Sequence, residues 1–337
     1  MPTIRDVAQR AGVAPTKVSR VINNSGYVTQ EKRELVEAAI ADLKYVPNTL
    51  ARSFRFKQTN TIALVLTDVT NPFWTEVARG VEDAAREQNF NVILCNTDES
   101  AGRQAEYLSV LLQKQVDGIL LVPANSTVAP IEAIQAQGTA LVVLDRRVPA
   151  AHVDIVRCDS EGGAHQLIQH ALSLGHCRIA VLTGPSDVSS AQDRVAGYRR
   201  ALVEAGIEVI EDLIFYGQFV QASGYQMAQQ ALLARPRPTA LFAANNFIAI
   251  GAWRALHEVG LRIPEDMTLV GFDDLPASLV VEPFLTVAAQ PGYEMGKQGT
   301  DLLLTRLVEE TPVQPQEIVL PTQLIVRGSS GTPRNGS

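Results

Sequence analysis

Apolar residues recur with helical spacing over the first 45 residues of the chain. Two short segments each place their apolar side chains on one face. These positions are Ile4, Val7 and Ala8 in the first segment, and Val18, Val21 and Ile22 in the second. Thr3 is suited to cap the first helix, and Pro15 suits the first turn of the second. Gly12 between them permits a positive φ. The pattern therefore predicts two short helices joined by a tight turn.

The outer face of the second predicted helix is polar and basic. It carries Thr16, Lys17, Ser19, Arg20 and Asn23. A small helical domain with a solvated face would show the same pattern, but the distribution of charge along the chain distinguishes the two. The first 60 residues hold 10 Lys and Arg against 5 Asp and Glu, whereas the whole chain has 29 against 36. A head of charge +5 on a body of charge −12 favours a helix-turn-helix that reads DNA, with Arg20 as the candidate for a guanine contact.

A third helix is predicted over residues 29–43, capped by Thr29. Its expected apolar stripe consists of Leu35, Val36, Ala39, Ile40 and Leu43. Pro47 ends this helix, and a short basic segment follows up to residue 57. Either a flexible linker or a short helix starting after Asn48 fits this segment, because so short a helix is marginal in water.

From Asn60 onward, short apolar runs alternate with amphipathic helices of about 10–16 residues. A first set of expected strands covers 62–66, 91–95, 117–122 and 140–144, and a second set covers 154–158, 178–182, 213–216, 240–243 and 267–272. A strand at 286–288, a helix at 293–308 and terminal strands at 317–320 and 323–326 complete the pattern. Two successive α/β sets predict two similar lobes, each a parallel sheet with helices on both faces.

Polar and aromatic residues come directly after many of these strands. Ligands bind at the carboxyl ends of strands in open α/β sheets, so these residues are the candidate binding site. They are Phe73, Trp74, Asp145, Arg146, Arg194, Asn245, Asp273 and Gln290. Carboxylates accept from hydroxyls, guanidinium groups donate, amides do both, and aromatic faces can stack on a sugar ring. The set predicts a small polyhydroxylated ligand. Because two arginines are present, a sugar acid remains an alternative ligand, and a purine fits this chemistry less well.

The runs T-I-R-D-V-A-Q-R-A-G-V and V-S-R-V-I-N-N-S-G-Y-V resemble the start of a LacI/GalR-family transcriptional regulator. The resemblance implies a helix-turn-helix head over 1–46 and a hinge helix over 47–59 that orders on DNA. In the family an apolar side chain of this helix, usually Leu, opens the minor groove, and Phe54 stands at that position here. The DNA contacts implied are Thr3, Pro15, Thr16, Lys17, Ser19, Arg20, Asn23, Tyr27, Leu50, Arg52 and Phe54.

The remainder resembles the two-lobed, type I periplasmic-binding-protein-like effector domain of this family. The resemblance implies one lobe from 60–157 and 290–320, a second from 158–289 and 321–328, and a disordered tail over 329–337. The eight strand-end residues match the ribose-type branch, in which they hold the sugar. Trp74 replaces the usual Phe, and Asn246 replaces the usual Asp.

The expected partners are a pseudo-palindromic double-stranded operator, a sugar effector and a second copy of the chain. Residues 328–337 carry no apolar heptad, so we expect a dimer rather than a tetramer. No cofactor, metal or membrane is expected, and the protein is expected in the cytoplasm, where its three cysteines stay reduced.

Two other classes were considered: a periplasmic sugar receptor and a sugar-modifying enzyme. The receptor would need a signal peptide and no basic head. For the enzyme we find no nucleophile–base pair, and the P-loop-like run 292–297 is one residue short of the motif, which favours a helix start. The five histidines are expected at solvated helix and loop positions.

Overall fold

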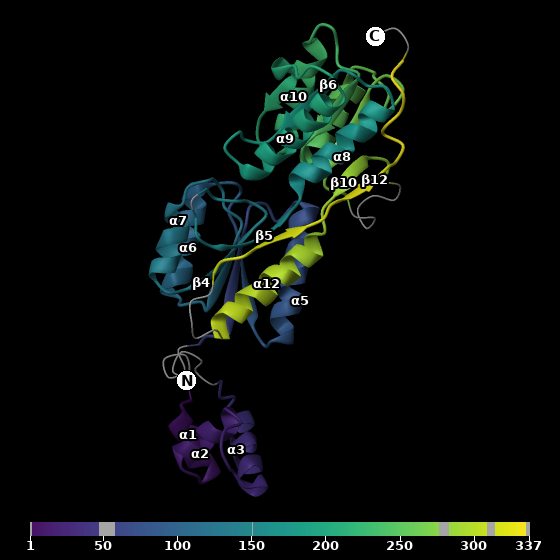
Figure 1. Ribbon diagram of the computed structural model, residues 1–337. Helices are drawn as coiled ribbons and strands as arrows, with labels where there is room; N and C mark the ends of the chain where they lie inside the picture. Colours follow the sequence, from purple (N-terminus) through teal and green to yellow (C-terminus); the bar gives the residue numbers. More distant parts are fainter. Residues whose placement is uncertain (1, 47–57, 150, 276–282, 309–313, 335–337) are drawn as a thin grey trace. The chain divides into compact units, whose positions relative to one another are not determined.

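The computed structural model of the chain describes residues 2–46, 58–149, 151–275, 283–308 and 314–334. The chain forms two compact units, Met1–Thr59 and Asn60–Ser337 (Figure 1). Within the described ranges, no helix is both long enough and apolar enough to cross a membrane.

Three helices form the first unit. They are α1 (Ile4–Ala11), α2 (Pro15–Ile22) and α3 (Gln30–Asp42). The predicted capping by Thr3 is confirmed, because its hydroxyl accepts from the Asp6 backbone N–H while the Asp6 carboxylate accepts from the Thr3 backbone N–H at 2.7 Å. Gly12 ends α1 with a φ of 63°, which confirms the tight turn. One fully buried valine from each helix forms the centre of the core: Val7, Val18 and Val36.

One expectation for the third helix is confirmed in position and another is wrong. Thr29 is the N-cap residue of α3, as predicted, although its side chain makes no capping hydrogen bond. Leu35, expected in the apolar stripe, is 49% exposed. From α3, the residues that pack into the core of this small unit are Val36, Ala39, Ile40 and Leu43. Leu35 lies about 100° around the helix from Val36 and so falls outside that stripe.

The second unit contains two six-stranded sheets. The strands are β1 (Thr61–Leu66), β2 (Asn91–Asn96), β3 (Gly118–Leu121), β4 (Ala140–Leu144), β5 (Asp154–Cys158), β6 (Ile179–Thr183), β7 (Ile214–Tyr216), β8 (Ala240–Ala243), β9 (Thr268–Phe272), β10 (Thr286–Ala289), β11 (Glu317–Leu320) and β12 (Gln323–Ile325). The first sheet has the order β11-β5-β4-β3-β1-β2, and the second has the order β12-β10-β9-β8-β6-β7. All these pairs are parallel except β10–β12, so the predicted pair of parallel sheets is confirmed.

Helices cover both faces of each sheet (Figure 1). The first sheet packs against α5 (Pro72–Glu87), α6 (Ala101–Gln113), α7 (Ala129–Ala136) and α12 (Gly292–Val308), and we call this assembly the N-lobe. The second packs against α8 (Ser160–Ser173), α9 (Ser189–Glu204), α10 (Gln221–Leu233) and α11 (Asn246–Glu258), and forms the C-lobe. A short 3₁₀ turn, η1 (Glu211–Leu213), precedes β7.

Three short connections join the lobes within the described residues. The chain leaves the N-lobe after β5, returns after β10 through α12, and leaves it again after β11 to form β12. These connections fall at residues 158–160, 289–292 and 320–323. Two lobes linked by three short segments are suited to hinge motion, because only a few backbone positions need to change.

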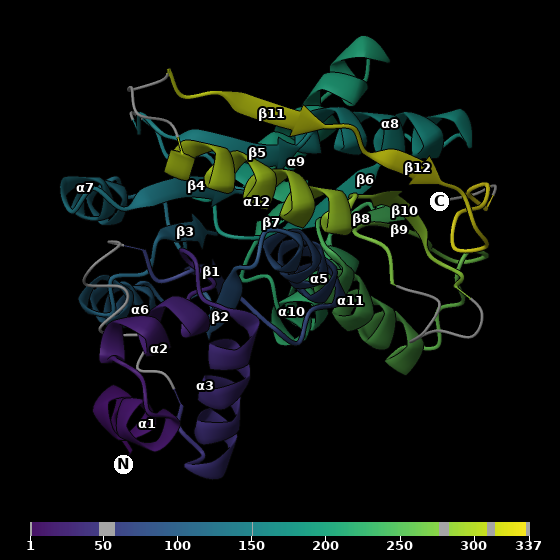
Figure 2. The same ribbon diagram turned by 90° about the horizontal axis from the view of Figure 1, so that it is seen from below.

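Close packing of α5 against α12 fixes the N-lobe side of the site (Figure 2). A Cβ atom at Gly80 would lie 2.0 Å from the Tyr293 carbonyl oxygen, and one at Gly296 would lie 2.1 Å from the Val77 carbonyl oxygen. Only glycine allows the two backbones to approach so closely. The run at 292–297 is therefore a helix start, as predicted, and not a phosphate loop.

The C-terminal segment packs on the C-lobe and corrects two expectations. Ser329 is fully buried, accepts from the Thr286 N–H at 2.8 Å and donates to the Leu269 carbonyl at 2.6 Å. The disordered tail expected from residue 329 therefore does not begin there. His176, expected in solvent, is 1% exposed and hydrogen bonds to the Gly331 carbonyl at 2.7 Å. Neither the burial of Ser329 nor that of His176 could be predicted from the sequence, because their partners lie far away along the chain.

Candidate functional sites

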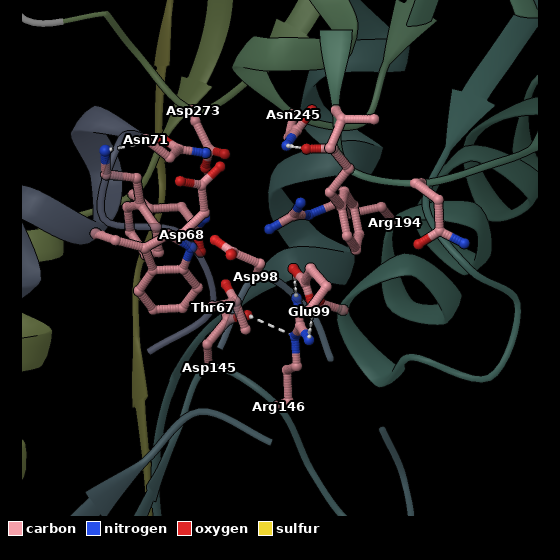
Figure 3. A pocket seen from close by; sticks show the side chains of 17 residues that line it. Thr67, Asp68, Asn71, Asp98, Glu99, Asp145, Arg146, Arg194, Asn245 and Asp273 are labelled. Atoms are coloured by element: carbon pink, nitrogen blue, oxygen red, sulfur yellow. Dashed lines mark hydrogen bonds and ion pairs between the residues drawn. The ribbon is translucent and has the colours of Figure 1, made fainter. Parts of the chain in front are cut away.

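A cavity of about 320 Å³ lies between the two lobes. The eight residues predicted from the strand ends all line it: Phe73, Trp74, Asp145, Arg146, Arg194, Asn245, Asp273 and Gln290. Phe73 and Trp74 come from the start of α5, and the others come from the ends of strands or the helices after them. The structure thus brings the predicted set together in one place (Figure 3). Their contact with a ligand stays a prediction.

Two aspartates occupy matching positions in the two lobes. Asp145 follows β4 in the N-lobe and Asp273 follows β9 in the C-lobe. Both adopt left-handed backbone conformations, with φ of 62° and 67°. Asp tolerates this region better than most residues, but it is still sparsely populated outside glycine. Such strain is typical of sites where the direction of a side chain matters, and here both carboxylates line the cavity.

Arg146 forms an ion pair with a carboxylate of its own lobe. Its guanidinium group donates to both carboxylate oxygens of Glu99 at 2.6 Å and to the Pro123 carbonyl at 2.8 Å (Figure 3). A bidentate pair of this kind is strong and geometrically specific. The pair neutralises the cation, although the Arg146 Nε remains without a hydrogen-bond partner among the described residues.

Arg194 is held above an aromatic ring in the C-lobe. Its guanidinium carbon lies 4.0 Å from the centre of the Phe272 ring, and one terminal nitrogen donates to the Ala244 carbonyl at 2.6 Å. Its side chain points into the cavity in Figure 3, toward the side where Asp273 lies. Because it is 3% exposed and fixed by these contacts, Arg194 presents a preorganised donor.

Gln290 and Asn245 differ in how much of their hydrogen-bonding capacity remains free. Gln290 donates to Asp273 at 2.5 Å, which leaves its own carbonyl oxygen without a described partner. Asn245 instead caps α11, since its side-chain oxygen accepts from the Ile248 N–H at 2.8 Å. Its amide nitrogen donates to the Phe219 carbonyl at 3.4 Å. Asn245 therefore has less free hydrogen-bonding capacity than the sequence suggested.

Unpartnered polar atoms gather at the cavity. Among the described residues, six buried side-chain polar atoms have no hydrogen-bond partner, and five of them belong to residues that line it. The five are Thr67 Oγ1, Asp145 Oδ1, Arg146 Nε, Arg194 Nε and Gln290 Oε1. Buried polar groups are normally paired, because an unpaired one costs about 1–3 kcal/mol. A ligand with several hydroxyl groups could satisfy both the donors and the acceptors in this set.

Burial shapes the charge of the cavity. It raises the pKa of Asp145 and Asp273 above the ordinary value of 3.8, while the Arg194 cation opposes this shift in both residues. An ionised carboxylate accepts hydrogen bonds at both oxygens, whereas protonation turns one of these oxygens into a donor. Since the pKa values are raised, this change occurs at a higher pH than for an exposed aspartate.

Several lining residues were missed in the sequence analysis. They are Thr67, Asp68, Asn71, Asp98, Glu99, Ser190, Gln218, Phe219 and Val220. Thr67, Asp98 and Glu99 follow β1 and β2 closely, so the strand-end rule applied to every strand would have found them. Phe219 lies beyond β7 on a loop, and its ring lies 5.7 Å from the Arg146 guanidinium carbon and 6.0 Å from that of Arg194. No local sequence signal marks this position.

The first unit presents α2 with the polar face that was predicted. Pro15, Thr16 and Arg20 are exposed, Lys17, Ser19 and Asn23 are partly exposed, and Tyr27 is 84% exposed. Thr3, also predicted to contact DNA, is exposed at the start of α1. Lys32 lies so close to Lys17 that it lowers the pKa of that ammonium group. Cations that repel one another at a surface are stabilised by a polyanion. Leu50, Arg52 and Phe54 lie outside the described residues.

A helix-turn-helix unit with a basic outer face, joined to a two-lobed domain with a polar cavity, defines a ligand-responsive DNA-binding regulator. Residues 3–48 match the family of bacterial regulatory proteins, lacI family, and residues 59–326 match the periplasmic binding proteins and sugar binding domain of the LacI family. The chain belongs to the LacI family of transcriptional regulators, which are not enzymes.

Comparisons over the whole chain agree with this assignment. The ribose operon repressor of Escherichia coli (strain K12) is 36% identical, over 98% of this chain and 100% of that protein. The lac repressor dimer bound to operator and the anti-inducer ONPF is 28% identical with a TM-score of 0.85, over 98% of this chain and 99% of that one. A LacI family regulator from Enterococcus faecium with bound ribose is 33% identical with a TM-score of 0.71, over 80% and 98%.

Proposed function

We propose that this protein is a dimeric, cytoplasmic transcriptional repressor whose affinity for a pseudo-palindromic operator is set by a neutral monosaccharide in the interlobe cavity. Ribose is the first ligand to test. The division into a head at 1–46, a hinge at 47–59 and the two lobes is part of this proposal, as is the absence of catalysis. The observation that carries it is the set of five unpartnered donors and acceptors that belong to residues lining one cavity.

The charges around the cavity favour a neutral ligand over a sugar acid. Five carboxylates line it, from Asp68, Asp98, Glu99, Asp145 and Asp273, against two guanidinium groups. One of those guanidinium groups is already neutralised by Glu99. A ligand carboxylate would therefore enter a site with an excess of negative charge, which costs free energy in a poorly solvated cavity.

The size of the cavity favours a small ligand. At about 320 Å³ it lies at the lower end of the range of small-molecule sites, which is roughly 300–1,000 Å³. Phe73 and Trp74 form an edge-to-face pair with ring centres 4.7 Å apart, so one apolar wall is available for a sugar ring. A purine would need donors and acceptors in one plane. This site instead offers them from both lobes, as a ring with hydroxyls on several sides requires.

The test is a thermal-shift screen of the full-length protein against pentoses, hexoses, sugar acids, purines and cellobiose, followed by calorimetry. A ligand that binds only the folded state raises the melting temperature by mass action. We expect ribose or another neutral monosaccharide to give the largest shift and to change operator affinity. A shift from a purine or a sugar acid alone would contradict the proposed ligand class.

Glu99→Gln should change this selectivity. The substitution keeps the shape of the side chain but removes the negative charge that neutralises Arg146. The positive charge of the guanidinium group is then available to bind the carboxylate of a ligand. We expect the ratio of ribonate to ribose affinity to rise by about tenfold or more, as judged by calorimetry. Glu211→Gln, which removes the exposed carboxylate partner of Arg199 in the C-lobe, is the matched control. An unchanged ratio in the Glu99 variant would contradict the electrostatic argument.

A further inference from the structure

Two asparagine side chains join the lobes beside the cavity. Asn71 precedes α5 in the N-lobe, and Asn246 begins α11 in the C-lobe. The Asn71 amide nitrogen donates to the Asn246 side-chain oxygen at 3.1 Å, and the Asn246 amide nitrogen donates to the Asn71 side-chain oxygen at 2.9 Å. The two residues are 5% and 0% exposed. This reciprocal pair exists only while the lobes are held together.

Both members of the pair are fixed within their own lobes. The Asn71 side-chain oxygen also caps α5 by accepting from the Phe73 N–H at 3.1 Å. Asn246 is the first residue of α11, and its backbone N–H lowers the pKa of Asp273, which lines the cavity. The pair therefore connects rigid elements that carry predicted ligand contacts, although Asn246 itself does not line the cavity.

A second connection joins the lobes from another part of the cavity. The Arg147 backbone N–H donates to the Ser189 hydroxyl at 2.8 Å, and its guanidinium group donates to Asp193 at 2.5 Å. Arg147 is the residue after Arg146, and Figure 3 shows Asn71 and Arg146 at different edges of the cavity. The Ser126 hydroxyl of the N-lobe also donates to the Asp187 carbonyl of the C-lobe, so the asparagine pair is one of several connections between the lobes.

We propose that Asn71 and Asn246 form a closure latch, a pair that stabilises the closed cleft and sets effector affinity without Asn246 touching the effector. This inference rests on the proposed function only in assuming that the effector binds the closed cleft. Opening exposes both amides to water, which satisfies them. Removing one partner instead leaves the other buried and unpaired in the closed state alone. Apparent affinity falls in proportion to the fraction of molecules that can close.

An amide pair suits this position better than an ion pair. The cavity already holds more carboxylates than cations, and Asp273 lies next to the pair. Asparagine offers a donor and an acceptor without adding charge. The latch therefore closes the cleft without changing the electrostatic preference of the ligand site.

The first test is calorimetry with ribose on Asn246→Ala. We expect about 10- to 100-fold weaker binding, with the order of preference among sugars unchanged. The matched control is Ser329→Ala, which also removes a buried side chain with two hydrogen bonds, both inside the C-lobe. The control should lower the melting temperature and leave ribose affinity within about twofold. Unchanged affinity in Asn246→Ala, or an equal loss in the control, would overturn the latch.

A double-mutant cycle separates the latch from the helix cap. Asn71→Ala also removes the α5 cap, so its effect alone is mixed. In the double variant Asn71→Ala/Asn246→Ala no amide is left unpaired. We therefore expect its loss of affinity to be smaller than the product of the two single losses. Losses that simply multiply would show that the two side chains act separately.

A distance measurement tests the latch even if ribose is not the effector. Spin labels on the exposed Cys177 in the C-lobe and on a Lys114→Cys variant in the N-lobe report the separation of the lobes by pulsed electron paramagnetic resonance. Dilution with unlabelled protein isolates pairs within one chain. In the ligand-free protein, Asn246→Ala should increase the population at long distance. An unchanged distribution would overturn the latch, whereas failure of ribose to bind would count only against the proposed ligand.

Discussion

Asp273→Ala should abolish the response to the effector while leaving operator binding by the ligand-free protein intact. Asp273 is 4% exposed, is held by Gln290 at 2.5 Å, and directs its carboxylate at the cavity (Figure 3). A carboxylate that accepts from two ligand hydroxyls contributes about 1.5–3 kcal/mol for each bond. The expected loss of ribose affinity is therefore about 10²- to 10⁴-fold.

Two measurements check this result. Calorimetry should show the loss of affinity, and operator binding titrated with ribose should become flat. Asp266→Ala removes a partly buried carboxylate that pairs with Arg262 and Arg334 away from the cavity in the same lobe, and it serves as the control. An unchanged titration curve in Asp273→Ala would rule out its role.

Arg20→Ala should weaken operator binding and relax the preference at one base pair in each half-site. Arg20 is exposed on α2, and its side chain lies 3.5 Å from where a Cβ atom of Gly26 would be. A bidentate contact to guanine is worth about 1–3 kcal/mol of discrimination. A dimer loses it twice, so the expected loss of affinity is roughly 30-fold or more.

Selection of operator sequences from a random pool, followed by gel-shift titration, measures both effects. Arg10→Ala is a suitable control, because Arg10 lies on α1 and pairs with Asp42 at 2.6 Å rather than extending from α2. It should change affinity little and leave the selected sequence as it is. An Arg20→Ala protein that selects the same sequence with the same affinity would refute direct base contact by Arg20.

The strands and strand ends that position the site could be predicted from the sequence. Strand ends can be predicted because buried apolar runs stop abruptly. In a parallel sheet these ends all lie at one edge of the sheet. Asp145 and Asp273 were found in this way, and the structure brings them to the same cavity. The cap at Thr3 and the turn at Gly12 were equally local, and both are confirmed.

The parts that were missed depend on contacts between distant segments. Phe219 reaches the cavity from a loop that carries no periodic signal. Asn71 and Asn246 are 175 positions apart, and their pairing depends on how closely the lobes approach each other. Burial of His176 depends on a C-terminal segment whose composition suggested a disordered tail. Local patterns therefore identify which residues are near a site, whereas pairing across lobes has to be observed.

Energetic coupling between the cavity and the DNA-reading helices can be measured by reciprocal titration. Operator affinity is measured with and without saturating ribose, and ribose affinity with and without saturating operator. Linkage requires the two ratios to be equal, and we expect both to be about 5- to 150-fold. Operator affinity that does not change at any ribose concentration, although ribose binds, would show that the cavity and the DNA-reading helices are not coupled.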